Sequence, residues 1–453
     1  KALGRVFPDR VAAWAGPIAQ AEAAAARLAG EPAKLVAEVE AALAPLAAAA
    51  KTITIHCVGH AHIDMNWQWS WQETVAITDD TFLSMLRLMD EFPTFTFTQD
   101  QAAVYELMRR HHPETFDRIR ARVAEGRWEV TASHWVEGDR NLAGGEALIR
   151  QLAEARAFCR EHLGLKPEDI TVDWPCDCFG HAATLPLIDA GAGVKYCYLM
   201  RSGGTDRPEL FRWRHPAGGM VTVYRDPRNY NGVPRAWLAE KAVDFAVATG
   251  RRDHLLSYGV GDHGGGPTRR DLRCVLDMDA WPVFPRWRFS TAHAFFTAVA
   301  GGEMPVREGE LNYEYSGCYS AQSPIKRANR ANENACAHAD HASALGAALA
   351  GMTVPHDRLR EAWRDTVFGH FHDILPGSGV PATRHYHLGQ AQGIAATAGA
   401  VAVDRLRAVA ASIDTSFAAP AAGAEPISTR DTTSGEAGAG RLSAHLPQTG
   451  VAV

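Results

Sequence analysis

Apolar and polar residues alternate along the chain in a way that predicts repeated strand–helix units between residues 52 and 290. Short runs of β-branched and aromatic residues, typical of strands, occur at residues 52–58, 95–98, 128–135, 170–174, 194–200, 220–224, 254–260 and 287–290. Apolar residues at helical spacing lie between many of them, as at residues 80–91, 101–110, 145–163 and 182–190. This order predicts an α/β fold with a parallel sheet covered by helices, and seven or eight such units predict a closed or nearly closed barrel.

The pattern differs on both sides of the barrel expected at residues 51–300. Residues 1–50 carry Ala and Leu at helical spacing, which predicts an N-terminal helical lead-in. Three long helical stretches at 324–349, 356–372 and 383–413 predict a three-helix bundle domain over residues 301–413. Residues 414–453 are mostly Ala, Gly, Pro, Ser and Thr, and we interpret them as a linker or as the start of a truncated domain.

Composition narrows the classes of function. The 453 residues include 46 basic and 52 acidic side chains, so the formal net charge is −6, which argues against a general nucleic-acid or anionic-membrane binder. No apolar run reaches the roughly 18 residues of a membrane span. The eight Cys show no CxxC pair, so we expect mostly buried, reduced thiols in a cytoplasmic protein. Cys176 and Cys178 are only weak candidates as zinc ligands.

Unusual polar residues follow three of the predicted strands. His62 and Asp64 follow the first strand, Asp177 follows the fourth, and Asp262 follows the seventh. Because the carboxyl ends of parallel strands carry the active site in α/β folds, these clusters predict a site there. Gly261–Thr268, written GDHGGGPT, lacks the spacing and the Lys of a phosphate loop, so nucleotide binding is not expected.

His and Asp side chains also gather near the end of the second bundle helix. His372 and Asp373 lie between apolar residues just before a Pro-Gly pair. Together with His62, Asp64 and Asp177, they supply nitrogen and oxygen ligands that suit a divalent ion such as zinc. Each group also has a simpler interpretation, as a His–Asp hydrogen bond or as a helix cap, and spacing alone does not decide between them.

Six motifs in this order resemble glycoside hydrolase family 38, the α-mannosidases, and look closest to its cytosolic and bacterial branch. The motifs are GHAHIDMNW, WVEGDRNLAGGEALIRQ, DWPCDCFGH, GDHGGGPT, GELNYEYSGCYSAQSPIKRANR and FHDILPGSG, and the resemblance covers residues 52 to 412. It implies a (β/α)7-type barrel followed by a three-helix bundle and large β-rich C-terminal domains. The chain would then be the catalytic half of a longer enzyme, and residues 414–453 would begin a truncated β-rich region.

The resemblance also implies an activity and a set of residue roles. It implies one Zn²⁺ per chain, other divalent ions being conceivable, and retaining hydrolysis of terminal α-mannosidic bonds in oligosaccharides. By motif, the zinc ligands would be His62, Asp64, Asp177 and His372, the nucleophile Asp177, the general acid/base Asp262, and the sugar-contacting residues Trp67, Asp373 and Arg201. Members of the family are often oligomeric, so a homo-oligomer is among the expectations.

Two other functions remain open from the sequence. A metal-dependent polysaccharide deacetylase also uses Asp and His ligands in a related barrel, but the KRANR and FHDILPGSG motifs speak against it. A non-catalytic carbohydrate-binding remnant of a truncated hydrolase is the second alternative, although all candidate ligands and Asp177 are present.

Overall fold

The computed structural model describes residues 1–27, 32–201, 208–312 and 314–414. Its strands are β1 (Thr54–His60), β2 (Phe97–Gln99), β3 (Trp128–Val130), β4 (Val172–Asp173), β5 (Tyr196–Leu199), β6 (Leu210–Arg214), β7 (Met220–Arg225), β8 (Asp253–Tyr258), β9 (Arg286–Phe289) and β10 (Val306–Arg307). Its α-helices are α1 (Ala2–Val6), α2 (Val11–Ala26), α3 (Pro32–Ala50), α4 (Trp71–Glu91), α5 (Ala102–His111), α6 (Pro113–Ala124), α7 (Gly145–Phe158), α8 (Leu185–Gly191), α9 (Leu238–Thr249), α10 (Arg269–Ala280), α11 (Ala292–Val299), α12 (Ser323–Ala350), α13 (His356–Phe368) and α14 (Pro381–Ser412). Short segments η1 (Pro8–Arg10), η2 (Cys159–Leu163), η3 (Pro167–Asp169) and η4 (Ser316–Tyr319) lie between them.

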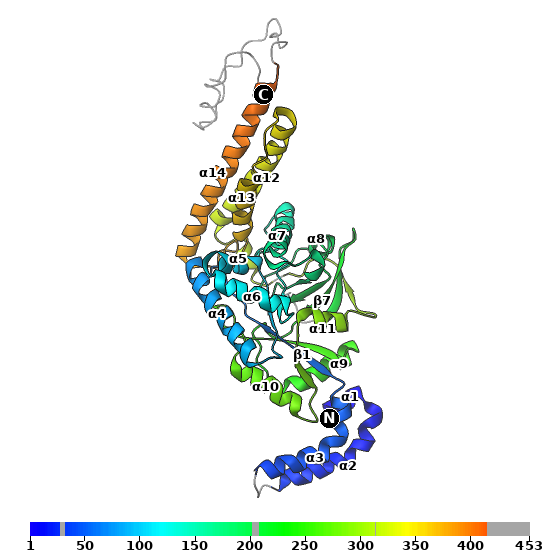
Figure 1. The fold of residues 1–453 in the computed structure, drawn as a ribbon. Coiled ribbons are helices and arrows are strands. Elements are labelled where there is room, and N and C mark those ends of the chain that lie inside the picture. The colour runs from blue at the N-terminus through cyan, green and yellow to red at the C-terminus, as the bar shows by residue number, and fades with distance from the viewer. Residues whose placement is uncertain (28–31, 202–207, 313, 415–453) are drawn as a thin grey trace. The chain divides into compact units, whose positions relative to one another are not determined.

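The strands form two five-stranded sheets. In the first, the order is β3-β2-β1-β8, and β9 also pairs with β1. In the second, the order is β10-β6-β7-β5-β4. Every pair is parallel except the β6–β7 hairpin. The mixed α/β fold predicted from the alternation is therefore confirmed, with helices around the strands (Figure 1).

The closed barrel is not confirmed, because no closed sheet is present among the described residues. Between β3 and β4, side chains replace the backbone ladder: Asp173 accepts hydrogen bonds from Ser133 Oγ at 3.0 Å and from Arg140 Nη2 at 2.8 Å. Between β7 and β8, the carbonyl oxygen of Leu255 accepts one from Arg228 Nη2 at 2.7 Å. These buried polar contacts hold the two sheets together where backbone pairing stops.

The described chain falls into two compact units. One contains Lys1–Asn334 and Glu361–Ala395, and holds both sheets; the other contains Ala335–Arg360 and the chain from Ala396 on. The three long helices predicted after residue 323 are present as α12, α13 and α14. Their packing as one three-helix bundle is not confirmed, and the domain boundaries stay predictions. The tail at residues 415–453 lies outside the described residues.

Strand β1 is buried along almost its whole length, as expected for a parallel strand covered on both faces. It pairs with β8 from Thr54 opposite Asp253 to Gly59 opposite Tyr258. The carboxyl ends of β1 and β8 therefore lie side by side at the point where the polar segments begin. Among the described residues, no helix is both long and apolar enough to cross a membrane.

Candidate active site

Four buried side chains from three distant parts of the chain converge. His62 and Asp64 follow β1, Asp177 follows β4, and His372 follows α13, and their ligand atoms all lie within 4.8 Å of one another. Nε2 of His62 lies 2.9 Å from Asp64 Oδ1, and Nε2 of His372 lies 3.4 Å from the same oxygen. Nε2 of His372 also lies 3.6 Å from Asp177 Oδ2. The structure thus brings together the four residues predicted as metal ligands.

This cluster, which we call the His–Asp cluster, has the properties of a cation site. The two Nε2 atoms and Asp64 Oδ1 are buried, and although they lie close to one another, none of them has a well-aligned hydrogen bond within the described residues. Burial lowers the pKa of His372, but Glu137, Asp177 and Asp64 outweigh it and raise that pKa well above its usual value. The surroundings therefore favour positive charge. Two imidazole nitrogens and two carboxylates fit a divalent ion such as zinc.

Sequence reasoning assigned no role to Glu137, whose side chain is buried beside the cluster. Its Oε2 lies 3.0 Å from Nδ1 of His62, and its Oε1 accepts hydrogen bonds from the backbone N–H groups of Asp177 and Cys178. Burial raises the pKa of Glu137, but the neighbouring His62 and His372 lower it more, so that the net pKa lies below the usual range. The sequence contained one indication of its role: Glu137 directly follows the apolar pair Trp135-Val136 in the motif WVEGDRNLAGGEALIRQ.

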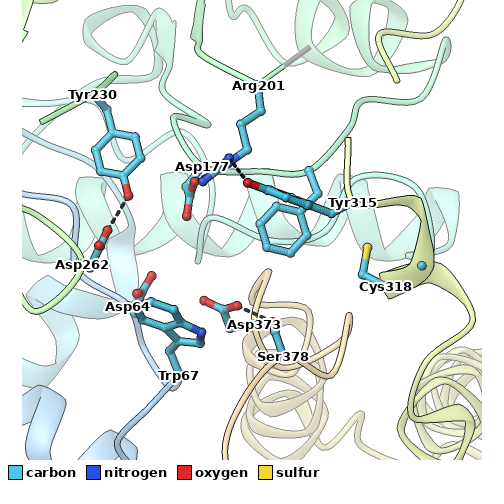
Figure 2. A pocket seen from close by; sticks show the side chains of 12 residues that line it. Asp64, Trp67, Asp177, Arg201, Tyr230, Asp262, Tyr315, Cys318, Asp373 and Ser378 are labelled. Atoms are coloured by element: carbon cyan, nitrogen blue, oxygen red, sulfur yellow. Dashed lines mark hydrogen bonds and ion pairs between the residues drawn. The ribbon is translucent and has the colours of Figure 1, made fainter. Parts of the chain in front are cut away.

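A cavity of about 470 Å³ lies over the cluster (Figure 2). This volume is within the range of small-molecule sites. Its lining residues are Asp64, Trp67, Asp177, Phe179, Arg201, Tyr230, Asp262, Tyr315, Gly317, Cys318, Asp373 and Ser378. Every residue predicted to act on substrate therefore lines this one cavity, and the two predicted histidine ligands lie beside it.

Asp177 belongs both to the His–Asp cluster and to the cavity wall. Nε of Arg201 donates a hydrogen bond to Asp177 Oδ1, and Nη1 of Arg201 donates one to the hydroxyl of Tyr315 at 3.1 Å (Figure 2). Burial lowers the pKa of Arg201, but the negative charge of Asp177 raises it more, so the guanidinium stays charged. The guanidinium of Arg201 therefore lies against Oδ1 of Asp177, and Oδ2 of Asp177 faces the imidazoles of His62 and His372.

Asp262 lies on another side of the cavity, after β8. The hydroxyl of Tyr230 donates a hydrogen bond to Asp262 Oδ1 (Figure 2). The backbone of Asp262 is in the left-handed region, with φ 64°, which few non-glycine residues adopt. Its carbonyl oxygen accepts a hydrogen bond from the N–H of Asp64 at 3.0 Å. Tyr230 was missed from the sequence, since no motif surrounds it.

Two buried cysteines, Cys176 and Cys178, lie beside the His–Asp cluster, and each forms a further group with Glu137 and one of the two histidines that could hold an ion. Sγ of Cys176 lies 3.5 Å from Nδ1 of His62, the ring nitrogen that faces Glu137. Burial, reinforced by Glu137, raises the pKa of Cys178 to about 11, which keeps this thiol protonated at neutral pH. Among the groups found in the described residues, only the His–Asp cluster offers four ligands, two imidazole nitrogens and two carboxylate oxygens, so we assign the cation site to it. All eight cysteines are free thiols in the structure.

Comparison with known proteins decides the family. The model of the glycosyl hydrolases family 38 N-terminal domain matches residues 52–314, more than half of the chain. The chain belongs to glycoside hydrolase family 38. The alpha mannosidase middle domain matches residues 314–408 of this family 38 chain.

Individual relatives agree with the family. Alpha-mannosidase G of Dictyostelium discoideum is 29% identical over 72% of this chain, and Alpha-mannosidase 2C1 of Homo sapiens is 29% identical over 72%. The match covers 30% of the first protein and 32% of the second, so the chain spans about a third of the length of these relatives. The crystal structure of an alpha-mannosidase from Enterococcus faecalis V583 matches with a TM-score of 0.72 at 18% identity, covering 80% of this chain and 43% of that one. This structural match supports the mixed α/β fold described above.

Proposed function

We propose that this family 38 chain is a zinc-dependent retaining α-mannosidase that hydrolyses terminal α-mannosidic bonds of oligosaccharides by double displacement. One observation carries the proposal: Asp177 lies in the His–Asp cluster and in the cavity wall at once, and a second carboxyl group, Asp262, lines the same cavity. A retaining glycosidase needs one carboxylate as nucleophile and a second carboxyl group as acid and then base.

The first displacement would use Asp177 and Asp262 together. Asp177 attacks the anomeric carbon while Asp262 gives its proton to the leaving oxygen, so the glycosidic bond breaks as the mannosyl–Asp177 ester forms. Arg201 donates a hydrogen bond to Asp177 and directs this carboxylate. The hydroxyl of Tyr230 holds Asp262 in place.

The second displacement would reverse these roles. Asp262, now ionised, removes a proton from water, and the water oxygen attacks the anomeric carbon, which releases Asp177 and mannose with retained configuration. Trp67 offers a flat apolar face to the sugar, and Asp373 is placed to contact sugar hydroxyls. Nε2 of His62 and of His372, with Asp64 and Asp177, would hold the zinc ion, which when bound would chelate the adjacent 2- and 3-hydroxyls of mannose.

Hydrolysis of an aryl α-mannoside, measured with and without a chelator, tests the proposal. We expect turnover, about one zinc ion per chain, loss of turnover in the chelator, and α-mannose as the first product by NMR. Asp177→Asn should lower kcat by at least about 10³-fold, as expected when a covalent nucleophile is lost.

Other outcomes would contradict the proposal. Release of acetate from N-acetylated sugars without mannose would indicate the deacetylase. Sugar binding without any turnover would indicate a non-catalytic remnant. Activity in a metal-free preparation would rule out the zinc role. The family match favours the mannosidase over the deacetylase, and the cytoplasmic location expected from the sequence stays a prediction.

A further inference from the structure

Glu137 contacts three of the four residues of the His–Asp cluster. Its Oε2 lies 3.0 Å from Nδ1 of His62, and its Oε1 accepts the N–H group of Asp177. Its backbone carbonyl oxygen lies 2.8 Å from Nδ1 of His372 and accepts the N–H of His372 at 3.2 Å. The residue is only 3% exposed, so water does not compete for these contacts.

These contacts determine which nitrogen of each imidazole carries the proton. A carboxylate and a carbonyl oxygen only accept hydrogen bonds, so the ring nitrogens that face them, Nδ1 of His62 and Nδ1 of His372, carry the proton. Sγ of Cys176 also lies 3.5 Å from Nδ1 of His62, but this thiol donates to Oε2 of Glu137 at 3.7 Å. In a neutral imidazole, Nε2 then keeps its lone pair. The Nε2 atoms are the two that face Asp64 and Asp177 without a well-aligned hydrogen bond. One residue thus directs both ring lone pairs toward the cluster.

Glu137 is itself held firmly. Its N–H donates to Oε1 of Gln101 at 3.0 Å, and Nε2 of Gln101 donates to the carbonyl oxygen of Ile63, between His62 and Asp64, at 2.9 Å. Gln101 is 2% exposed and has φ 58°, an uncommon backbone conformation for this residue type. On the other side, Gly138 forms an antiparallel bridge with Phe371, next to His372.

We propose that Glu137 is the positioning residue of the metal centre, which fixes both histidines in the tautomer that presents Nε2 to the ion and holds the backbone of Asp177. This inference rests on the metal site of the proposed function. It assigns Glu137 no contact with substrate, so its effect on turnover passes through the ion.

The substitution Glu137→Gln tests this role with little change of shape. An amide oxygen at the place of Oε1 can still accept the N–H groups of Asp177 and Cys178. The amide NH₂ then faces Nδ1 of His62, which must become an acceptor, and the ring proton moves to Nε2, where it blocks the ion. We expect the zinc Kd, measured by competition with a chelator of known affinity, to rise by about 10- to 100-fold.

The zinc dependence of hydrolysis distinguishes a residue that positions the metal ligands from a residue that takes part in the reaction. Mannoside hydrolysis by Glu137→Gln should be weak at limiting zinc and return toward the wild-type kcat at saturating zinc, whereas Asp177→Asn should stay inactive at every zinc concentration. A zinc Kd within about twofold of wild type would overturn the inference. So would an activity loss that zinc does not restore.

Glu129→Gln is the matched control. Glu129 is another interior glutamate that accepts two backbone N–H groups, from Ala292 at 2.7 Å and from His293 at 2.8 Å, but it lies away from the His–Asp cluster. Its substitution should leave the zinc Kd and the zinc dependence of hydrolysis unchanged. If Glu129→Gln weakened zinc binding as much as Glu137→Gln, general destabilisation would explain both, and the inference would fall.

A second variant covers the case in which Glu137→Gln does not fold. Gln101→Met keeps the size of the side chain and removes both hydrogen bonds that fix Glu137 and Ile63. We expect a several-fold higher zinc Kd with the same rescue by zinc, and an unchanged Kd would count against the inference. Measurements on the wild type distinguish failure of the two proposals. If the wild type neither binds zinc nor hydrolyses the mannoside, the proposed function is contradicted. If Glu137→Gln binds zinc as tightly as the wild type, only this inference is contradicted.

Discussion

The two carboxyl groups across the cavity differ in their surroundings. Asp177, the proposed nucleophile, accepts a hydrogen bond from the guanidinium of Arg201. Asp262 accepts a hydrogen bond from the neutral phenol of Tyr230. Its own backbone has the left-handed conformation, which sets the direction of its side chain. One carboxylate beside cations and a second beside a neutral donor is the asymmetry that a nucleophile and a proton donor need.

Asp262→Asn should reveal the proton donor through its dependence on the leaving group. An amide cannot protonate the leaving oxygen, so aryl mannosides with poorly acidic phenols should slow by about 10²- to 10⁴-fold. Aryl mannosides with strongly acidic phenols need no proton in this step and should slow far less. The measurement is kcat/KM across a series of phenols. Equal losses across the series would place the acid elsewhere in the cavity.

Asp189 gives a prediction about stability, away from the cavity. Its side chain is fully buried, neither carboxylate oxygen makes a hydrogen bond, and Nε2 of His134 is 3.9 Å away. Burial, followed by the charge of Asp173, raises the pKa of Asp189 well above its usual value. In the unfolded chain this carboxyl group ionises near pH 3.9. Above that pH, the folded state therefore keeps a proton on Asp189 that the unfolded chain has lost. As a result, the free energy of unfolding falls as pH rises.

Asp189→Asn should remove this pH dependence. The melting temperature of the variant minus that of the wild type should increase steadily from about pH 4 toward pH 7, because only the wild type must keep a carboxyl group protonated. Asp117→Asn, at an exposed position, is the control for replacing an aspartate by an asparagine as such. A difference for Asp189→Asn that stays constant with pH would show that the folded and unfolded pKa values of Asp189 are equal.

At the scale of elements, the hydrophobic pattern predicted eight of the ten strands of the described residues, β1 to β5 and β7 to β9. Strands β6 and β10 were missed for physical reasons. Arg212 and Arg214 interrupt β6, which pairs antiparallel as a hairpin with β7, and β10 has two exposed residues. The pattern also predicted a closed or nearly closed barrel, and this closure is not confirmed, because side chains at Asp173 rather than a backbone ladder connect β3 and β4.

Helix α10 directly follows the loop that carries Asp262, and its first turn has a reciprocal cap. Thr268 Oγ1 accepts the N–H of Asp271 at 3.3 Å, and Asp271 Oδ2 accepts the N–H of Thr268 at 3.0 Å. Thr268→Ala should lower the free energy of unfolding by about 1 kcal/mol, measured in urea, whereas Thr268→Ser keeps the cap and should lie near wild type. Equal losses in both variants would show that the threonine methyl group, and not the cap, stabilises this helix start.

At the scale of the whole molecule, the site joins segments that are far apart in the sequence. Residues 62–64, 177 and 372 come from three regions, and the residue pattern by itself offered only their place after strands or a helix as a sign that they meet. The pattern therefore supplied the ligand types, and it was the resemblance to family 38 that implied one common ion. Glu137 and Tyr230 remained hidden because their importance comes from what they touch, and hydrogen-bond partners leave no periodic pattern.

An ion that joins these three segments must also stabilise the fold, since the site does not exist in the unfolded chain. At free zinc 100-fold above the Kd, binding should add about 2.7 kcal/mol to the free energy of unfolding. For a large domain this corresponds to a rise of several degrees in Tm. Thermal unfolding of chelator-treated protein, with zinc added back in steps, measures this effect.

The variant His372→Ala connects the stabilisation to the His–Asp cluster. It removes one proposed ligand, so its Tm should respond far less to zinc than that of the wild type. His385→Ala, in an exposed position on α14, should keep the full response. Zinc stabilisation that survives in His372→Ala would place the ion at another site, and a wild-type Tm that is independent of zinc would show that the cluster holds no ion. The unfolding experiment needs no substrate, so it tests the metal site independently of the proposed mannosidase activity.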